Sequence, residues 1–86
     1  MWTPEAAENL DSIVAYIEAF NIAAAQRLGE RLVALAESLT EFSERGRPVG
    51  NGKREMTIVR PYVLRYSVTD EQVLILRIRH GARDLD

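Results

Sequence analysis

Apolar residues in the first part of the chain recur at spacings of three and four positions, the period of an amphipathic helix. Thr3 suits the N-cap of this helix, Pro4 its first position and Glu5 its first turn. The apolar positions of this face are Ala6, Leu10, Ile13, Val14, Ile17 and Phe20. Together they predict a helix from Pro4 to about Phe20.

A second segment with the same period follows almost at once. Asn21 is a good N-cap for it. The apolar positions after this cap are Ala24, Leu28, Leu32, Leu35, Leu39 and Phe42. Because the turn is so short, the two predicted helices must form an antiparallel hairpin, over residues 4–45. Gly46 and Pro48 are expected to end the second helix, and residues 50–52 to form a loop.

The period changes to two from Lys53 onward, which is the alternation of β-strands. Within residues 53–80 the pattern predicts three strands, namely Arg54–Val59, Tyr62–Val68 and Val73–His80. Turn-like residues separate these strands at 60–61 and 69–72. The order of elements predicts one α+β domain, residues 1–86, with a helical hairpin packed on one face of a small antiparallel sheet. A short polar tail, residues 81–86, follows the last strand.

Alternation along the strands predicts two different faces of the sheet. The face under the helices should carry Leu64, Tyr66, Leu74, Leu76 and Ile78. The opposite face should carry Arg65, Arg77 and Arg79, with Val63, Val73 and Ile75 between them. No predicted element covers this second face. A surface that combines arginine with aliphatic side chains is typical of a binding site for a partner.

Charge is distributed unevenly along the chain. Residues 1–44 carry two basic and eight acidic side chains, whereas residues 45–86 carry nine basic and five acidic ones. The basic second half is the better candidate for contact with an anionic partner. The alternative is a plain division of charge between a solvated helix face and a sheet face. Since the net charge of the whole chain is −2, sequence-independent binding to free DNA is not expected.

Several kinds of chemistry are not expected from this composition. The chain has no cysteine and a single histidine, His80, so neither a disulfide framework nor a metal site is predicted, and no cofactor is implied. The first residues lack the basic and apolar regions of a signal peptide, and no apolar run is long enough to span a bilayer. We therefore expect a cytoplasmic protein that does not associate with membranes.

Several segments, spread in order over nearly the whole chain, resemble the RelE/ParE toxins of type II toxin–antitoxin systems. They include residues 2–6 (WTPEA), 42–48 (FSERGRP), 60–66 (RPYVLRY) and 75–83 (ILRIRHGAR). The resemblance implies a short N-terminal strand, a helical hairpin and three antiparallel strands. Only Met1 and Trp2 precede the helix cap, so the first strand is expected to be vestigial or absent. A sheet edge left open in this way would be a place for a partner strand.

The resemblance is closer to the ParE type, which implies a toxin that inhibits DNA gyrase, acts in plasmid stabilisation and is neutralised by a cognate antitoxin. In this interpretation the protein is not an enzyme. One alternative is a RelE-like, ribosome-dependent mRNA endoribonuclease. Ribonuclease members usually have an arginine where this chain has Val63 and a tyrosine near the end of the last strand, where His80 is followed by Gly81. A further alternative is an inactive homologue that acts as a binding module.

Each interpretation selects its own residues. Target binding is assigned to Arg65, Arg77, Arg79 and Arg83, in the strands and the tail. Antitoxin binding is assigned to Val63, Arg65, Val73, Ile75 and Arg77. A ribonuclease would use Glu55, Arg65, Arg79 and His80 as acid, base and phosphate-binding groups. Alternation places His80 on the helix side, which favours a structural role, while Glu55 on an edge strand could serve solubility alone.

Overall fold

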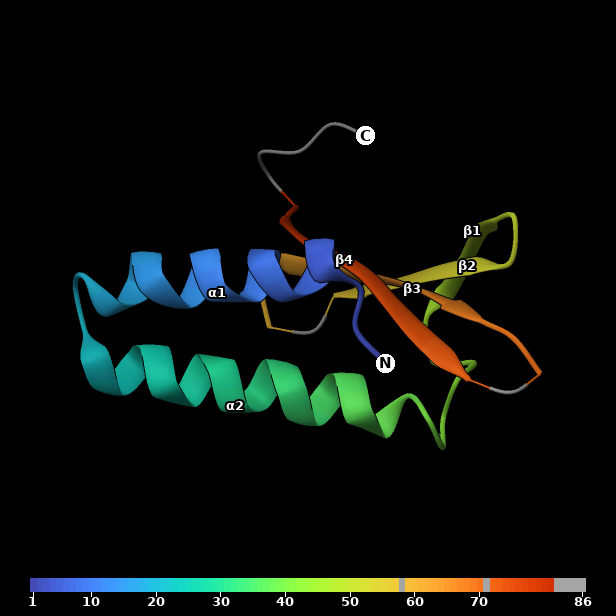
Figure 1. Ribbon diagram of the computed structural model, residues 1–86, viewed down its shortest axis with the longest axis horizontal. Coiled ribbons are helices and arrows are strands. Elements are labelled where there is room, and N and C mark those ends of the chain that lie inside the picture. Colours follow the sequence, from blue (N-terminus) through green and yellow to red (C-terminus); the bar gives the residue numbers. More distant parts are fainter. Residues whose placement is uncertain (58, 71, 82–86) are drawn as a thin grey trace.

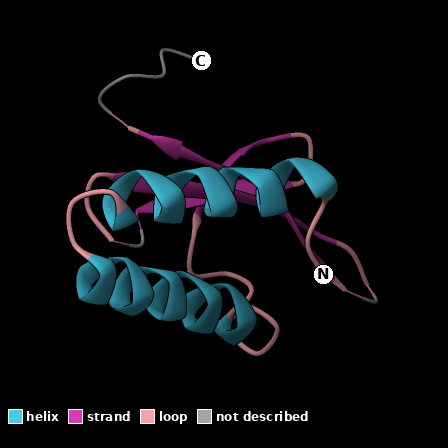
Figure 2. Cartoon of the chain, turned by 60° about the vertical axis from the view of Figure 1, so that its left-hand side comes forward, coloured by secondary structure: helices cyan, strands magenta, loops and turns pink. Residues whose placement is uncertain are grey.

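Two helices and four strands form the computed structural model, which describes residues 1–57, 59–70 and 72–81. In chain order they are α1 (Pro4–Glu18), α2 (Ile22–Ser38), β1 (Arg47–Gly50), β2 (Lys53–Thr57), β3 (Tyr62–Val68) and β4 (Val73–His80). The helices form a hairpin on one side of an antiparallel sheet of order β1-β2-β3-β4 (Figure 1, Figure 2). The predicted α+β architecture is confirmed.

Both helices begin where the sequence places their caps. Thr3 Oγ1 accepts a hydrogen bond from the backbone N–H of Ala6 at 3.1 Å, and Asn21 Oδ1 accepts one from that of Ala24 at 2.9 Å. The hairpin projects beyond the sheet, so the turn between the helices lies far from β1 and β2 (Figure 1). Phe20, predicted to lie on the buried face, is 75% exposed at this turn. That prediction is wrong because the sheet does not extend beneath the turn.

The sheet has one strand more than the sequence predicts. Residues 47–50 form β1, which pairs with β2 so that Arg47 is opposite Glu55. Pro48 looked like a breaker, but a residue without an N–H is tolerated in an edge strand. The turn into β2 uses positive φ angles at Gly50 (95°), Asn51 (56°) and Gly52 (73°). As a result, β2 lies inside the sheet rather than at its edge.

A β-bulge changes the alternation of β4. Arg65 of β3 is opposite Arg77, whereas the next residue of β3, Tyr66, is opposite Ile75. Leu76 is therefore the extra residue of the bulge. Because side chains alternate with a period of two, one inserted residue reverses the faces occupied by all the residues of β4 that precede it.

The assignments made by uninterrupted alternation are therefore wrong for the first half of β4. Val73 and Ile75, predicted on the arginine side, are 7% and 2% exposed and belong to the core. Leu74 and Leu76, predicted under the helices, are half-buried on the other side of the sheet. Leu76 lines a hollow there together with Arg77. The sequence pattern alone does not reveal which residue is inserted.

The N-terminal residues and α1 close part of the β4 edge. Trp2 forms an isolated parallel bridge with Ile75, whose backbone N–H donates to the carbonyl of Met1 at 2.7 Å. Farther along β4, the N–H of Ile78 donates to Asn9 Oδ1 on α1 at 3.0 Å. The predicted vestigial first strand is thus present as a single bridge. At these positions the edge is not open to a partner strand, because its outward groups already have hydrogen-bond partners.

The core lies between the helices and the inner face of the sheet. Its buried members are Ala6, Ala36, Leu39, Leu64, Tyr66, Val73, Ile75 and Ile78. Trp2 packs against this cluster, as expected for a residue beside the helix cap. Burial of each large aliphatic side chain contributes about 1.5–3 kcal/mol. The outer face of the sheet is therefore supported by packed strands rather than by loops.

Candidate partner-binding face

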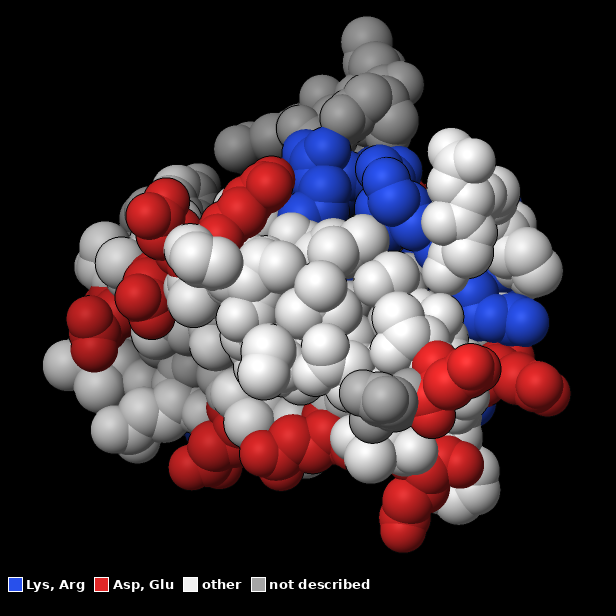
Figure 3. Space-filling model, turned by 45° about the vertical axis from the view of Figure 1, so that its right-hand side comes forward, with Lys and Arg blue, Asp and Glu red and all other residues white. Residues whose placement is uncertain are grey.

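Charged side chains from all four strands gather on the outer face of the sheet. We call this surface the arginine face and define it by Arg47, Lys53, Glu55, Arg65, Arg77 and Arg79. The register brings them together, since Glu55 is opposite Arg47 on one side and Arg65 on the other. Figure 3 shows Lys and Arg side chains gathered above an uncharged area, with Asp and Glu side chains mainly along other margins. The charge asymmetry of the sequence is thus also an asymmetry in space.

Glu55 lies at the centre of the arginine face and is only 4% exposed. Its Oε2 lies 2.6 Å from Nη2 of Arg65 and accepts a hydrogen bond from Nε of the same residue at 2.8 Å. Its Oε1 lies 3.4 Å from Nη2 of Arg79 and 3.5 Å from Nη2 of Arg47. One buried carboxylate is therefore compensated by three guanidinium groups, as a buried charge requires.

Two opposed effects set the pKa of Glu55. Burial acts to raise the pKa, because the ionised carboxylate loses hydration. The hydrogen bond and charge of Arg65, followed by those of Arg79, act in the opposite direction and prevail. The pKa of Glu55 therefore lies below its usual value. The expectation of an exposed glutamate on an edge strand is wrong, because β1 pairs with β2 and the three arginines cover the carboxylate.

A hollow of about 420 Å³ lies on the arginine face beside the start of α1. Lys53, Arg65 and Arg77 supply positive charge to its lining, and Leu76 supplies an apolar wall. Glu5 stands at the rim, with its Oε2 4.0 Å from Nε of Arg77. This combination suits a partner that offers carboxylates beside apolar side chains.

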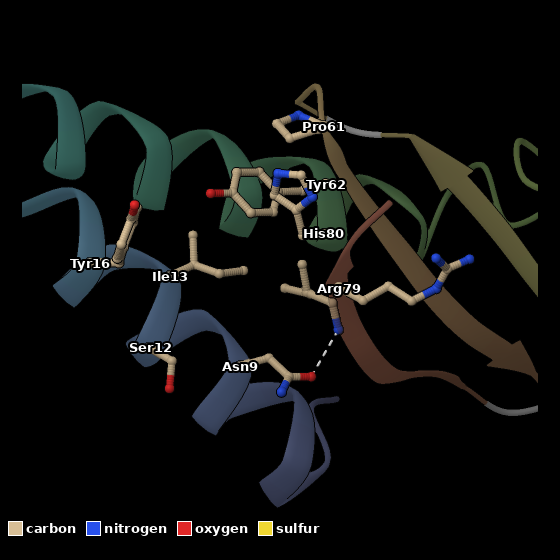
Figure 4. A pocket seen from close by; sticks show the side chains of 9 residues that line it. Asn9, Ser12, Ile13, Tyr16, Pro61, Tyr62, Arg79 and His80 are labelled. Carbon is tan, nitrogen blue, oxygen red and sulfur yellow. Dashed lines mark hydrogen bonds between the residues drawn. The ribbon is translucent and has the colours of Figure 1, made fainter. Parts of the chain in front are cut away.

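His80 lies elsewhere, in a groove of about 530 Å³ between α1 and the ends of β3 and β4. Its ring packs edge to face on that of Tyr62, with the centroids 5.7 Å apart. Arg79 also borders the groove, but its side chain points away from the two rings (Figure 4) and reaches Glu55. His80 is therefore on the helix side, as alternation predicts for it.

The residues proposed for a ribonuclease site are thus divided between two places. The structure brings Glu55, Arg65 and Arg79 together, but it does not add His80 to them. Arg77, predicted to bind the target, does lie on the arginine face. Arg83, the remaining target-binding candidate, lies outside the described residues.

Sequence reasoning missed several residues on this side of the sheet, both in the arginine face and beside it. Arg47 was missed because β1 was taken for a break, although Arg47-Pro48 could have been considered as the start of an edge strand. Leu74 and Leu76 replace Val73 and Ile75 as the outward aliphatic residues of β4. Only a signal for the bulge could have found them, and alternation contains none.

Within residues 1–57, 59–70 and 72–81, no three His, Cys, Asp or Glu side chains are grouped so that they could hold a metal ion. No helix in the same ranges has the length and apolar character needed to cross a membrane.

Residues 1–85 match the family described as "ParE toxin of type II toxin-antitoxin system, parDE". The chain belongs to the ParE toxin family. Toxin RelE2 of Caulobacter vibrioides is 48% identical over 83 residues, which cover 96% of this chain and 94% of that toxin. Toxin RelE1 of the same organism is 46% identical over 61 residues, which cover 67% of this chain and 66% of that toxin.

A solved structure agrees with this assignment. A chain of the chromosomal ParDE TA system from P. aeruginosa superposes on this ParE-family toxin with a TM-score of 0.80 and 27% sequence identity. The match covers 92% of this chain and 90% of that one. The RelE/ParE resemblance of the sequence is therefore confirmed. Because both RelE and ParE occur among the names of similar proteins, the names do not choose between the two target classes of the family.

Proposed function

We propose that this toxin acts by binding rather than by catalysis, that its target is DNA gyrase, and that it binds through the arginine face. In this proposal the bound toxin traps gyrase with cleaved DNA. The support is the basic, preorganised surface of the outer sheet, which the ion pairs around Glu55 hold in one arrangement.

The observation that carries the proposal is the position of Glu55. A general base needs a pKa near the working pH and must reach the proton that it removes. The carboxylate of Glu55 is buried beneath three guanidinium groups, and its pKa is lowered. His80, the other acid–base candidate, packs on Tyr62 in a separate groove. This arrangement favours a binding surface over a ribonuclease centre.

We also infer that a cognate antitoxin covers the arginine face. Such a partner would place apolar side chains on Val63, Leu74 or Leu76, the aliphatic residues on this side of the sheet. Its carboxylates would pair with Arg65 and Arg77. A segment that becomes ordered on binding would fit this shallow surface.

The gyrase proposal is tested by adding the purified toxin to gyrase, ATP and supercoiled plasmid. Linear, protein-linked DNA after denaturation is the expected product. The informative variant is R47Q/R77Q, which removes two cations from the arginine face but leaves the short Arg65–Glu55 pair. We expect this variant to produce the same amount of cleaved plasmid only at about tenfold higher concentration than the wild type. This corresponds to a loss of about 1.4 kcal/mol of binding free energy. The matched control, R27Q/R31Q, removes two exposed cations from α2 and should behave like the wild type.

The alternatives give different results in the same experiments. If no cleaved plasmid accumulates but transcripts are truncated in a translation extract, the target is mRNA and the gyrase proposal is wrong. If neither product forms and growth is unaffected, the chain is an inactive homologue. If R47Q/R77Q traps gyrase as well as the wild type, the target does not bind through the arginine face.

A further inference from the structure

Glu55 is the one buried acidic side chain among the described residues, and it lies beneath the guanidinium groups of the arginine face. Arg65 directs both Nε and Nη2 toward this carboxylate, at 2.8 and 2.6 Å. Arg79 directs Nη2 toward the other oxygen at 3.4 Å, and its side chain is only 12% exposed. Donors that point down to Glu55 are not available to a ligand above the face.

Stability alone gives no reason for an ion cluster at this position. Burying a carboxylate costs free energy that its ion pairs only offset, and apolar substitutes for buried ion pairs are often as stable or more stable. A role in specificity is a second physical reason for such a group, as in coiled coils whose register a buried polar residue fixes. Nucleic acids are the ligands that would compete with a protein partner, because a sheet face with five cationic side chains is suited to their phosphates.

We propose that Glu55 determines the specificity of the arginine face by holding Arg65 and Arg79 against the sheet and so suppressing sequence-independent binding to nucleic-acid phosphates. The same cations, held in fixed positions, remain suited to carboxylates that a protein partner presents at matching positions. The inference rests on the proposed function in one respect, namely that the arginine face is the partner-binding surface. It adds a role for a residue that does not itself touch the partner.

The physical basis is the number of cationic groups that can reach phosphates. The logarithm of the binding constant for duplex DNA falls linearly with the logarithm of the salt concentration. The slope is about −0.9 for each phosphate that the protein neutralises. A phosphate backbone is a flexible target for mobile cations, which can each adjust to a nearby phosphate. Arginines fixed to an internal carboxylate cannot adjust without breaking that pair. Release of Arg65 and Arg79 should therefore raise both the affinity for DNA and its dependence on salt.

The test measures binding of a fluorescein-labelled duplex DNA of unrelated sequence by anisotropy, between about 50 and 200 mM salt. E55Q removes the central charge and releases the arginines. E5Q is the matched control, because it removes one acidic charge from the rim of the same face, where Glu5 is 65% exposed. We expect E55Q to bind the DNA at least about threefold more tightly than the wild type at low salt. The slope of its log binding constant against log salt concentration should be steeper by about one. E5Q should change the affinity less.

E55D covers the case in which E55Q does not fold. It keeps the buried negative charge, which the three arginines still compensate, but withdraws the carboxylate by one methylene group. If position matters, E55D gains affinity for DNA although its net charge is unchanged. Wild-type affinity in E55D, or equal gains in E55Q and E5Q, would overturn the proposal, because charge alone would then account for the data.

This experiment is independent of toxicity. A toxin that fails to trap gyrase, but whose Glu55 variants bind DNA as expected, would contradict the proposed target and leave the role of Glu55 intact. If the toxin traps gyrase while E55D and E55Q bind DNA like the wild type, the proposed role of Glu55 is wrong and the proposed target stands.

Discussion

The phenolic oxygen of Tyr66 lies 2.8 Å from the backbone nitrogen of Gly46, twenty residues earlier in the chain. It accepts a hydrogen bond from that N–H and donates one to the carbonyl oxygen of Ser43, also at 2.8 Å. Tyr66 is fully buried in β3, and its two partners lie in the segment that joins α2 to β1. One side chain thus fastens the end of the helical hairpin to the middle of the sheet.

Replacement of Tyr66 by phenylalanine should show how much the two hydrogen bonds of its hydroxyl contribute to the free energy of unfolding. Y66F keeps the ring in the core but leaves the N–H of Gly46 buried without its acceptor, which costs about 1–3 kcal/mol of unfolding free energy. Urea denaturation would measure the loss. Y16F is the control, since Tyr16 is exposed and its substitution should change stability by less than about 0.5 kcal/mol. Equal stability of Y66F and the wild type would mean that water replaces the lost hydroxyl.

Gly46 itself is required by the close approach of its neighbours. A Cβ atom at this position would lie 2.8 Å from the backbone oxygen of Glu55 and 2.8 Å from the hydroxyl oxygen of Tyr66. Because a backbone atom cannot move aside without disturbing the β1–β2 pairing, G46A should lose about 1–3 kcal/mol of stability.

The second helix offers a matched control for this substitution. A Cβ on Gly29 would meet only Cγ2 of Val14, at 3.4 Å, inside a helix. Alanine is favoured over glycine there by about 0.5–1 kcal/mol. G29A should therefore be neutral or stabilising, whereas G46A is destabilising. The same sign for both substitutions in thermal or urea unfolding would contradict this account of Gly46.

The parts of the fold that local rules govern could be read from the sequence. The caps at Thr3 and Asn21 and the helical period placed the starts of both helices correctly. The predicted end of the second helix near Gly46 is wrong, because α2 ends at Ser38. The missing information was tertiary: a proline is compatible with a strand only at an edge, and the edge at Pro48 depends on β1 pairing with β2. The burial of Glu55 follows from that pairing, so it could not be predicted either.

The bulge at Leu76 can be tested through stability. Ile75 is 2% exposed in the core, so I75A should cost about 2–5 kcal/mol. Leu76 is half-buried on the arginine side, where truncation leaves no enclosed cavity, and L76A should cost less than about 1.5 kcal/mol. Uninterrupted alternation makes the opposite prediction. A larger loss in L76A than in I75A would therefore rule out the observed register.

Asn9 provides a test of how the β4 edge is closed. Its Oδ1 accepts the outward N–H of Ile78 at 3.0 Å. N9A removes the acceptor, so the amide of Ile78 should exchange with deuterium faster, and the protein should lose about 0.5–1.5 kcal/mol. S12A is the control, because Ser12 is exposed on the same helix. Unchanged exchange at Ile78 in N9A would show that the hydrogen bond does not protect this edge.

The ion cluster on the arginine face predicts a specific dependence of stability on pH. The pKa of Glu55 is lowered in the folded protein, mainly by Arg65, against the opposing effect of burial. A carboxyl of this kind contributes stability that is complete above its unfolded pKa, about 4.3, and is lost as pH falls through the lower folded pKa. Wild-type stability should therefore fall more steeply than that of E55Q below about pH 4.

Urea unfolding of the wild type and E55Q from neutral pH to about pH 3 would measure this difference. At neutral pH the wild type should be the more stable of the two, because E55Q leaves three guanidinium groups around a neutral amide. The difference should shrink on acidification, since protonation removes the same charge from the wild type. E5Q is the control, because Glu5 is exposed and the substitution removes only one ion pair, with Arg77 at 4.0 Å. A constant difference between wild type and E55Q across this range would mean that the ionisation of Glu55 is not coupled to folding, and that the arginines are held by packing instead.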